Sequence, residues 1–386
     1  MIKQVGQGRM PACLQPTAIL LRRSAGALLL VMLAMAPALS VAQTPAVGGQ
    51  NGGGRPRNEP AGERQAERTQ REEGDAILGL ADSALAGKPT PSDFAVQWQN
   101  DFVKAQRGTF VPFTLSVDVS DLRQRSALVY VRAVRALQRP GTTRGTARVE
   151  EAYPVDAIFP VDLPPGSSAR ISRGFSVEPG EYDVFVVMRE RLDPAAPRMR
   201  PKVSVVKQAL SVPDFRTGEL TTSSVILADR LTVLNEPVPS DRLAERPYAI
   251  GRNEVVPAVD RRFGRDEELI VVFLVYNPMV TPDGQFDVRV DYHFFRKVAG
   301  AETGSGGGPH PPVRPGERYF NRTDSQRFNP ALMGAAFDPA TGEPVMAGQV
   351  VPLAAFEAGD YRLDVQVTDL LSGRSISRDV FFTVGS

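Results

Sequence analysis

The chain has very little cysteine and histidine, with one Cys and two His in 386 residues. Cys13 lies in an N-terminal stretch that we interpret as a leader, so the rest of the chain has no disulfide, no thiolate nucleophile and no cysteine-based metal site. His293 lies in a predicted strand, and His310 lies 17 positions later in a Gly- and Pro-rich loop, which makes a poor metal pair. We therefore expect no metal and no cofactor. We interpret His293 as structural, with a catalytic base as the alternative.

The chain also lacks a basic excess. It has 45 basic and 44 acidic residues. Residues 1–42 contain four basic residues and no acidic one, so the remaining 344 residues carry 41 basic and 44 acidic residues, a net charge of −3. A near-neutral chain offers no strongly positive surface to a phosphate backbone, and we expect no nucleic-acid partner.

Residues 1–42 have the pattern of a signal peptide. Basic residues precede an apolar run over residues 25–39, and Ser40 and Ala42 are the small residues of a cleavage site. The alternative is a retained membrane anchor, but the run has about 15 residues where a bilayer span needs roughly 20, and Pro37 interrupts it. We therefore expect an extracytoplasmic protein, which is periplasmic, outer-membrane associated or secreted.

Two segments separate this leader from the folded part. Residues 43–75 are Gly-rich and then alternate charges, so we expect a disordered linker, with a tether to the envelope as the alternative. Residues 76–92 hold one short helix and a connection, because Ile77, Leu80 and Ala81 recur at helical spacing. We expect this helix to pack against the first domain, and a partner-docking helix is the alternative.

From residue 93 onward the pattern is one of strands. No helical pattern of ten or more residues follows Gly108, which excludes folds that alternate helices with strands. We predict strands over residues 109–118, 127–134, 169–177, 182–188, 203–212, 224–228, 269–276, 286–295, 361–367 and 376–384. This spacing indicates an all-β chain with two consecutive domains, at residues 93–212 and 213–386.

Three segments of the second domain carry further signals. The continuously apolar run at residues 269–276 is typical of a central strand that is covered on both faces. Thr281-Pro-Asp-Gly284 is a turn signal, and we expect it to join this run to the strand from Phe286 as a hairpin. Residues 299–315 are rich in Gly and Pro and are expected to form a loop.

A phrase near the end of each domain occurs twice. Residues 178–188 read Glu-Pro-Gly-Glu-Tyr-Asp-Val-Phe-Val-Val-Met, and residues 357–367 read Glu-Ala-Gly-Asp-Tyr-Arg-Leu-Asp-Val-Gln-Val. In both copies a glycine that can take positive φ stands two positions before a tyrosine that opens a strand. In the second copy apolar and polar residues alternate, which predicts a strand with one buried and one solvent-exposed face. The first copy is apolar on both faces, so we expect another element to pack on its second face. The structural residues that we single out are Gly180, Tyr182, Gly359 and Tyr361.

This repeat resembles the start of strand F in immunoglobulin-like and fibronectin-like sandwiches, including the tyrosine corner, whose phenol hydroxyl bonds to upstream backbone. The resemblance implies two β-sandwich domains. The order of segments is also similar to immunoglobulin-like modules of secreted bacterial proteins that carry von Willebrand factor A-type domains, which implies an envelope location and an interaction role. The A-type domain itself is absent. Its metal motif, Asp-x-Ser-x-Ser, is approached by Asp118-Val-Ser120-Asp-Leu122, which fails at the last position, so no metal site is implied.

No catalytic constellation stands out. The acidic clusters at residues 150–151 and 266–268 place adjacent carboxylates on opposite faces of an extended chain, so we interpret them as solvated. Asp287, Arg289 and Asp291 share one strand face, where a ladder of surface salt bridges is expected and a calcium site is the alternative. Six aromatic residues that could line a carbohydrate platform are expected to lie mostly in the core: Tyr292, Phe294, Phe295, Tyr319, Phe320 and Phe328.

These observations favour an exported, non-catalytic protein of two immunoglobulin-like sandwiches. We expect it to act in protein–protein interaction or structural support in the bacterial cell envelope, with an unidentified envelope protein as its partner. The alternatives are a carbohydrate-binding module protein and, after it, an extracytoplasmic hydrolase. The oligomeric state stays open.

Overall fold

The computed structural model describes residues 61–136, 153–192, 199–298, 310–334 and 337–385. The predicted signal peptide, most of the predicted linker, the acidic pair at 150–151 and most of the predicted 299–315 loop lie outside the described residues. No helix among the described residues is long and apolar enough to cross a membrane.

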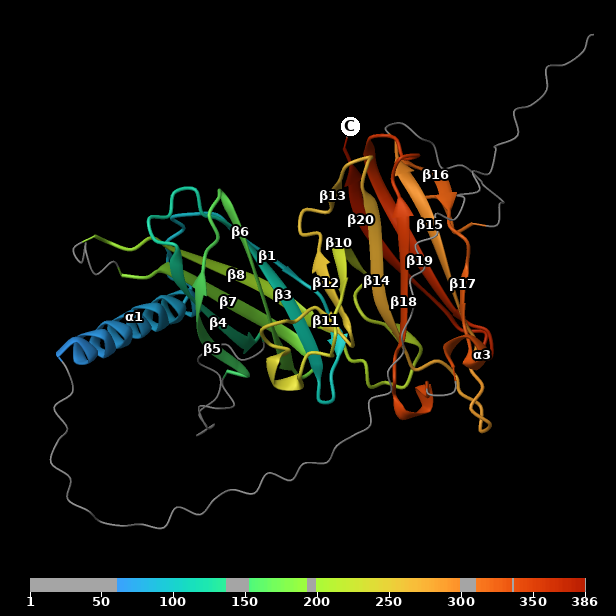
Figure 1. Cartoon of the computed structure of the whole chain (residues 1–386), viewed down its shortest axis with the longest axis horizontal. Coiled ribbons are helices and arrows are strands. Elements are labelled where there is room, and N and C mark those ends of the chain that lie inside the picture. The colour runs from blue at the N-terminus through green and yellow to red at the C-terminus, as the bar shows by residue number, and fades with distance from the viewer. Residues whose placement is uncertain (1–60, 137–152, 193–198, 299–309, 335–336, 386) are drawn as a thin grey trace, which may run out of the picture. The chain divides into compact units, whose positions relative to one another are not determined.

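The first half of the described chain forms two sheets that face each other (Figure 1). One sheet has the strand order β5-β4-β7-β8, and the other has the order β1-β3-β2 with β6 paired to the far side of β3. Both sheets contribute to one buried cluster, which includes Val111 and Leu115 from one and Val129 and Val184 from the other. The strands are β1 (Val96–Asn100), β2 (Val103–Lys104), β3 (Thr109–Asp118), β4 (Ser126–Arg135), β5 (Val155–Asp162), β6 (Ser168–Val177), β7 (Gly180–Glu190) and β8 (Val203–Val212).

The second half forms another pair of sheets. Their strand orders are β11-β12-β10-β14-β18, with β9 paired to β14, and β13-β20-β19-β15-β16, with β17 paired to β15. The rings of Phe273 on β14 and Tyr292 on β15 meet edge to face between the two sheets, with their centres 6.4 Å apart. The strands are β9 (Thr221–Thr222), β10 (Ile226–Val233), β11 (Ala249–Ile250), β12 (Asn253–Pro257), β13 (Arg262–Phe263), β14 (Glu268–Tyr276), β15 (Val288–Lys297), β16 (Glu317–Arg322), β17 (Gln326–Phe328), β18 (Val345–Pro352), β19 (Gly359–Asp369) and β20 (Ser375–Val384).

The fold is therefore all-β and immunoglobulin-like, built from sheets packed face to face. The short helical segments are η1 (Ser240–Arg242), α3 (Pro330–Met333) and η2 (Pro339–Thr341). Hydrogen bonds join the two pairs of sheets: the backbone N–H of Phe102 donates to Ser224 Oγ at 2.9 Å, and that of Lys104 donates to the Tyr276 hydroxyl at 3.0 Å. The division into two domains at residue 213 stays a prediction.

Helix α1 (Ala61–Leu85) is longer than the sequence suggests. It includes residues 61–75, which we expected to be disordered linker. The expectation was wrong because Arg, Glu, Gln and Ala are strong helix formers, and because Arg68 and Glu72 pair one turn apart at 2.9 Å. Glu73, on the same stretch, is 1% exposed and reaches Arg191 at 2.8 Å.

The helix covers the outer face of the sheet that contains β4, β7 and β8 (Figure 1). Ile77 and Ala81 are fully buried there and pack with Tyr130, Val187 and neighbouring side chains. This packing explains why the first copy of the repeated phrase is apolar on both faces: one face meets the opposite sheet, and the other meets α1.

The predicted hairpin between β14 and β15 is wrong. The turn itself forms, since the N–H of Gly284 donates to the Thr281 carbonyl at 2.9 Å. However, β14 pairs with β9, β10 and β18, whereas β15 pairs with β16, β17 and β19 in the opposite sheet. Both sides of β14 are already occupied by neighbours, so the chain crosses over the core instead of folding back.

Candidate interaction surface

The two repeated tyrosines have equivalent surroundings. The Tyr182 hydroxyl donates to the Glu178 carbonyl at 2.7 Å, and the Tyr361 hydroxyl donates to the Glu357 carbonyl at 2.8 Å. Both rings are buried, and burial raises the pKa of each phenol. The glycines two positions earlier have φ of 145° and 149°, which disfavours any other residue there. This is the bond that defines a tyrosine corner, and it places all four residues in the scaffold.

The outer face of β19 is not the wet face that its alternation predicts. Arg362 is 1% exposed and donates to both carboxylate oxygens of Glu317, at 2.9 and 2.7 Å. It also donates to Asp379 at 2.9 Å and to Asp364 at 3.2 Å, and its guanidinium lies 4.0 Å from the ring centre of Phe295. A charge removed from water is tolerated only when it is paired in this way.

Residues 310–316 cover this buried network. They are the last part of the connection between β15 and β16. The His310 ring stacks on Tyr319 with centres 4.2 Å apart, Pro311 is buried, and Arg314 forms an ion pair with Asp379. Burial alone would raise the pKa of Asp379, but the bonds from Arg314 and Arg362 hold it below its usual value.

The structure brings the two histidines together, which the sequence does not suggest. His293 is 5% exposed, and its Nδ1 lies 3.4 Å from the Tyr319 hydroxyl, while His310 stacks on that same ring. Burial lowers the pKa of His293; nearby Asp291 opposes this shift, and Arg322 and His310 add to it. Among the described residues, no group of three or more His, Cys, Asp or Glu side chains is placed to hold a metal ion.

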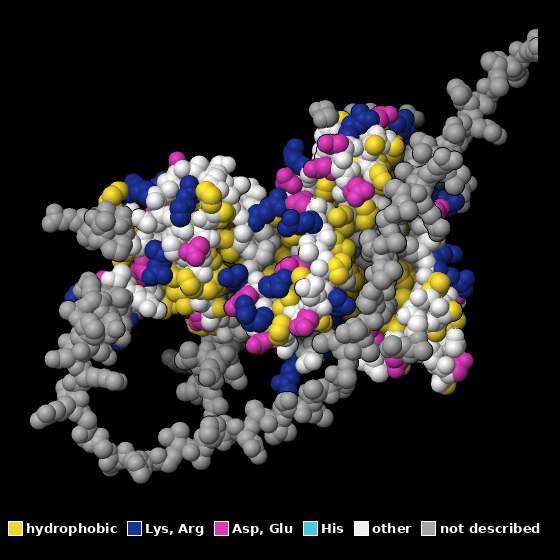
Figure 2. Space-filling model, viewed as in Figure 1, with side chains coloured by type: hydrophobic (Ala, Val, Ile, Leu, Met, Phe, Trp, Pro, Cys, Tyr) yellow, Lys and Arg dark blue, Asp and Glu magenta, His cyan; other side chains and the backbone are white. Residues whose placement is uncertain are grey.

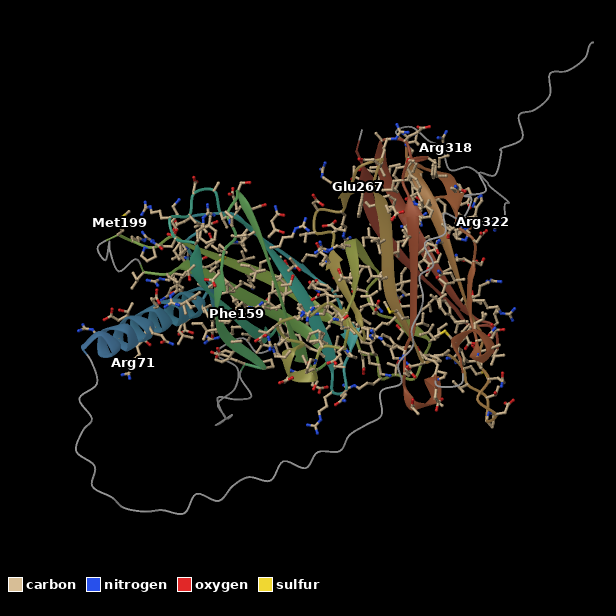
Figure 3. The ribbon with its side chains drawn as sticks, viewed as in Figure 1. Arg71, Phe159, Met199, Glu267, Arg318 and Arg322 are labelled. Atoms are coloured by element: carbon tan, nitrogen blue, oxygen red, sulfur yellow. The ribbon has the colours of Figure 1, made fainter. Side chains whose placement is uncertain are left out.

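The other candidate residues lie in ordinary structural positions. Arg289 pairs with Asp291 at 2.9 Å, so this part of the predicted ladder forms, whereas Asp287 pairs with Arg327 instead of Arg289. Glu267, labelled in Figure 3, accepts the N–H of Gly264 at 2.7 Å and so stabilises a turn.

The six aromatic residues do not form an exposed platform. Tyr292, Phe294, Phe295 and Phe328 are buried. Tyr319 has one face covered by His310, and Phe320 packs against Phe356 and Tyr361.

One group of exposed apolar side chains lies on two adjacent loops at an end of the second pair of sheets. Met279, Leu370 and Leu371 are 47%, 38% and 41% exposed. We call these three residues the end-loop surface. A buried carboxylate joins the loops, because Asp369 is 1% exposed and accepts the N–H of Met279 at 2.8 Å and that of Leu371 at 3.0 Å. It also accepts the N–H and the hydroxyl of Ser372, at 3.3 and 2.7 Å.

The sequence pattern does not predict the end-loop surface. Its one signal is the pair Leu370-Leu371 at the turn between two predicted strands, where polar residues are usual. In Figure 2, basic and acidic side chains are interspersed over the visible face, with hydrophobic side chains between them. No large area of one charge covers that face.

The fold and this surface define an all-β, immunoglobulin-like protein with exposed apolar loops. No protein-family model and no curated protein matches the chain. Two solved structures of bacterial alpha-2-macroglobulins are similar to it. That of Salmonella, reacted with methylamine, has 14% identity and a TM-score of 0.20 over 77% of this chain and 17% of its own. That of Escherichia coli, activated by porcine elastase, has 11% identity and a TM-score of 0.22 over 77% and 35%.

The chain therefore spans well under half of either macroglobulin. At these TM-scores the fold assignment rests on the sheets themselves. The expected similarity to modules of secreted bacterial proteins that carry von Willebrand factor A-type domains stays a prediction.

Proposed function

We propose that this chain is an exported, non-catalytic sandwich protein that binds another protein of the cell envelope through the end-loop surface. The observation that carries the proposal is the exposure of Met279, Leu370 and Leu371 around the buried, hydrogen-bonded carboxylate of Asp369. Export is supported by the signal-peptide pattern of residues 1–42.

The geometry favours binding because hydrogen bonds to Asp369 tie the two loops together without a partner. Burying a carboxylate is costly, and here Asp369 is compensated by four hydrogen bonds that fix the positions of Met279 and Leu371. A loop already held in one conformation loses less entropy on binding. Loops on a rigid scaffold are also where binding residues concentrate.

A carbohydrate-binding role has weaker support. Such a role needs flat, exposed aromatic faces, and the six aromatic candidates are either buried or covered by neighbouring rings. The end-loop surface is aliphatic, which suits an apolar protein surface better than a sugar.

A pull-down from native envelope with the mature chain as bait tests the proposal. A double substitution, Leu370→Asp with Leu371→Asp, places charges in the apolar contact and should weaken capture of the partner by at least about tenfold. Val233→Asp is the matched control, since Val233 is 69% exposed on β10 and lies outside the surface. Equal capture by the double variant and by the wild-type chain would refute the proposal, and so would the absence of any stable partner.

A further inference from the structure

Strand β20 has a long open edge. It pairs with β19 from Ser375 to Val384, but on its other side the parallel strand β13 covers only Thr383 and Val384. Residues 375–381 therefore have no neighbouring strand on that side in the part of the chain that the structure describes. An uncovered strand edge is a template for pairing with another chain.

The direction of the backbone groups follows from the bonds at the two ends of the strand. The carbonyl of Arg374 accepts a hydrogen bond from the N–H of Asp369, so it points toward β19. The N–H groups of Thr383 and Gly385 point to the opposite side, where they donate to the carbonyls of Arg261 and Phe263. Directions alternate along a strand, and the register with β19 is unbroken. The backbone groups that point outward from the open edge therefore belong to Ser375, Ser377, Asp379 and Phe381, which are all exposed.

Three other edges in the described sheets carry protection that β20 lacks. Strand β5 contains Pro160. The outward carbonyl of Gly348 on β18 accepts the side-chain amide of Gln326 at 2.6 Å. On β8, the N–H of Val205 donates to the carbonyl of Pro91 at 3.0 Å. The four outward N–H groups of β20 form no backbone bond to any described residue.

The side chains along this edge are suited to a partner strand. Phe381 is 43% exposed, with the ammonium of Lys297 5.5 Å from its ring centre. The charge of Asp379 is balanced by Arg362 and Arg314. Ser375 and Ser377 are small and uncharged. An added strand would thus meet a nearly neutral row with one aromatic anchor.

We infer that the open edge of β20 is a strand-docking site, at which an extended segment of the partner protein adds to the sheet alongside residues 375–381. This inference rests on the proposed function, because it specifies how the envelope partner binds next to the end-loop surface. Backbone hydrogen bonds supply the attachment, and an apolar or aromatic side chain of the segment packs against Phe381.

A second copy of this chain is a poorer occupant of the site. Antiparallel self-pairing that covers all of residues 375–381 is centred on Arg378, and it places the two Arg378 side chains opposite each other. Like charges that are directly opposite destabilise a strand pair. A segment from a different protein avoids this repulsion.

The test uses a phage-displayed library of random twelve-residue peptides, panned on the mature chain. Ser377→Pro removes one outward N–H and leaves the pairing with β19 intact. It should therefore weaken the binding of a selected peptide about tenfold. Ser377→Ala is the matched control: it also removes the hydroxyl but keeps the N–H, and it should bind within about threefold of the wild-type chain. Failure to select any peptide, or equal loss in both variants, would overturn the inference.

Hydrogen exchange gives a readout that needs no variant. The amides of Ser375, Ser377, Asp379 and Phe381 should exchange rapidly in the free protein and at least about tenfold more slowly with the peptide bound. Peptide binding that leaves these amides unprotected would overturn the inference even if Ser377→Pro fails to fold. The proposed function is judged separately. If the leucine double variant loses its envelope partner while no peptide binds along β20, the proposed function is supported and the strand-docking inference is wrong.

Discussion

At the residue scale, the two tyrosine corners offer a paired measurement. Tyr361→Phe removes a hydroxyl that donates to the Glu357 carbonyl and should lower the free energy of unfolding by about 1–2 kcal/mol. Tyr182→Phe removes the equivalent bond to Glu178 and should cost a similar amount. Urea denaturation of both variants measures the loss. A midpoint that does not move in either variant would show that the hydroxyl bonds contribute nothing to stability.

Single residues also show where sequence reasoning stops. The alternation of β19 correctly predicts that Tyr361, Leu363, Val365 and Val367 are buried. It fails at Arg362, because the side chains that compensate this charge, Glu317 and Asp379, come from strands 45 and 17 positions away. Spacing along one strand carries no information about such long-range partners.

At the scale of elements, the most regular strands are the easiest to predict. The expected ranges 109–118 and 203–212 match β3 and β8 at both ends. Two of the longer strands that the sequence does not predict have weak patterns: β5 contains Pro160 and mostly exposed residues, and β18 contains Gly348. These segments become strands because the neighbouring strands provide backbone hydrogen-bond partners, which their own sequences do not reveal.

Helix α1 carries one buried carboxylate, Glu73, that contacts the sheet beneath it. The carboxylate of Glu73 accepts the N–H of Leu192 at 2.6 Å and lies 2.8 Å from Arg191 and 3.6 Å from the nearly buried Arg189. Glu73→Ala leaves Arg189 without this partner and should destabilise the protein by an amount on the order of 3 kcal/mol. Chemical denaturation measures the loss, and limited proteolysis should show earlier cleavage within α1.

Glu72→Ala is the neighbouring control for this substitution. Glu72 pairs with Arg68 in solvent, and removing an exposed pair of this kind should change stability by less than about 0.5 kcal/mol. Equal effects of the two substitutions would mean that the buried carboxylate does not anchor the helix.

At the scale of the whole molecule, one carboxylate lies where the two pairs of sheets meet. Asp101 follows β1 and is 4% exposed, and its surroundings include Ser224, Tyr248 and Arg261 from the second half of the chain. Burial raises the pKa of Asp101 to about 6, and the Arg261 charge and the hydroxyls of Tyr248 and Ser224 only partly oppose it. The surroundings of Asp101 between the two pairs of sheets therefore favour the neutral, protonated carboxyl.

This raised pKa predicts how stability depends on pH. The folded protein holds a proton on Asp101 up to about pH 6, whereas an unfolded chain releases it near pH 4, so this residue's contribution falls as the pH rises through that window. Asp101→Asn keeps the site neutral at every pH. The free energy of unfolding of the variant, relative to that of the wild-type chain, should therefore increase by up to about 3 kcal/mol between pH 4 and pH 7.5. Urea denaturation across this range measures the difference, and a difference that stays constant with pH would show that Asp101 titrates normally in the folded protein.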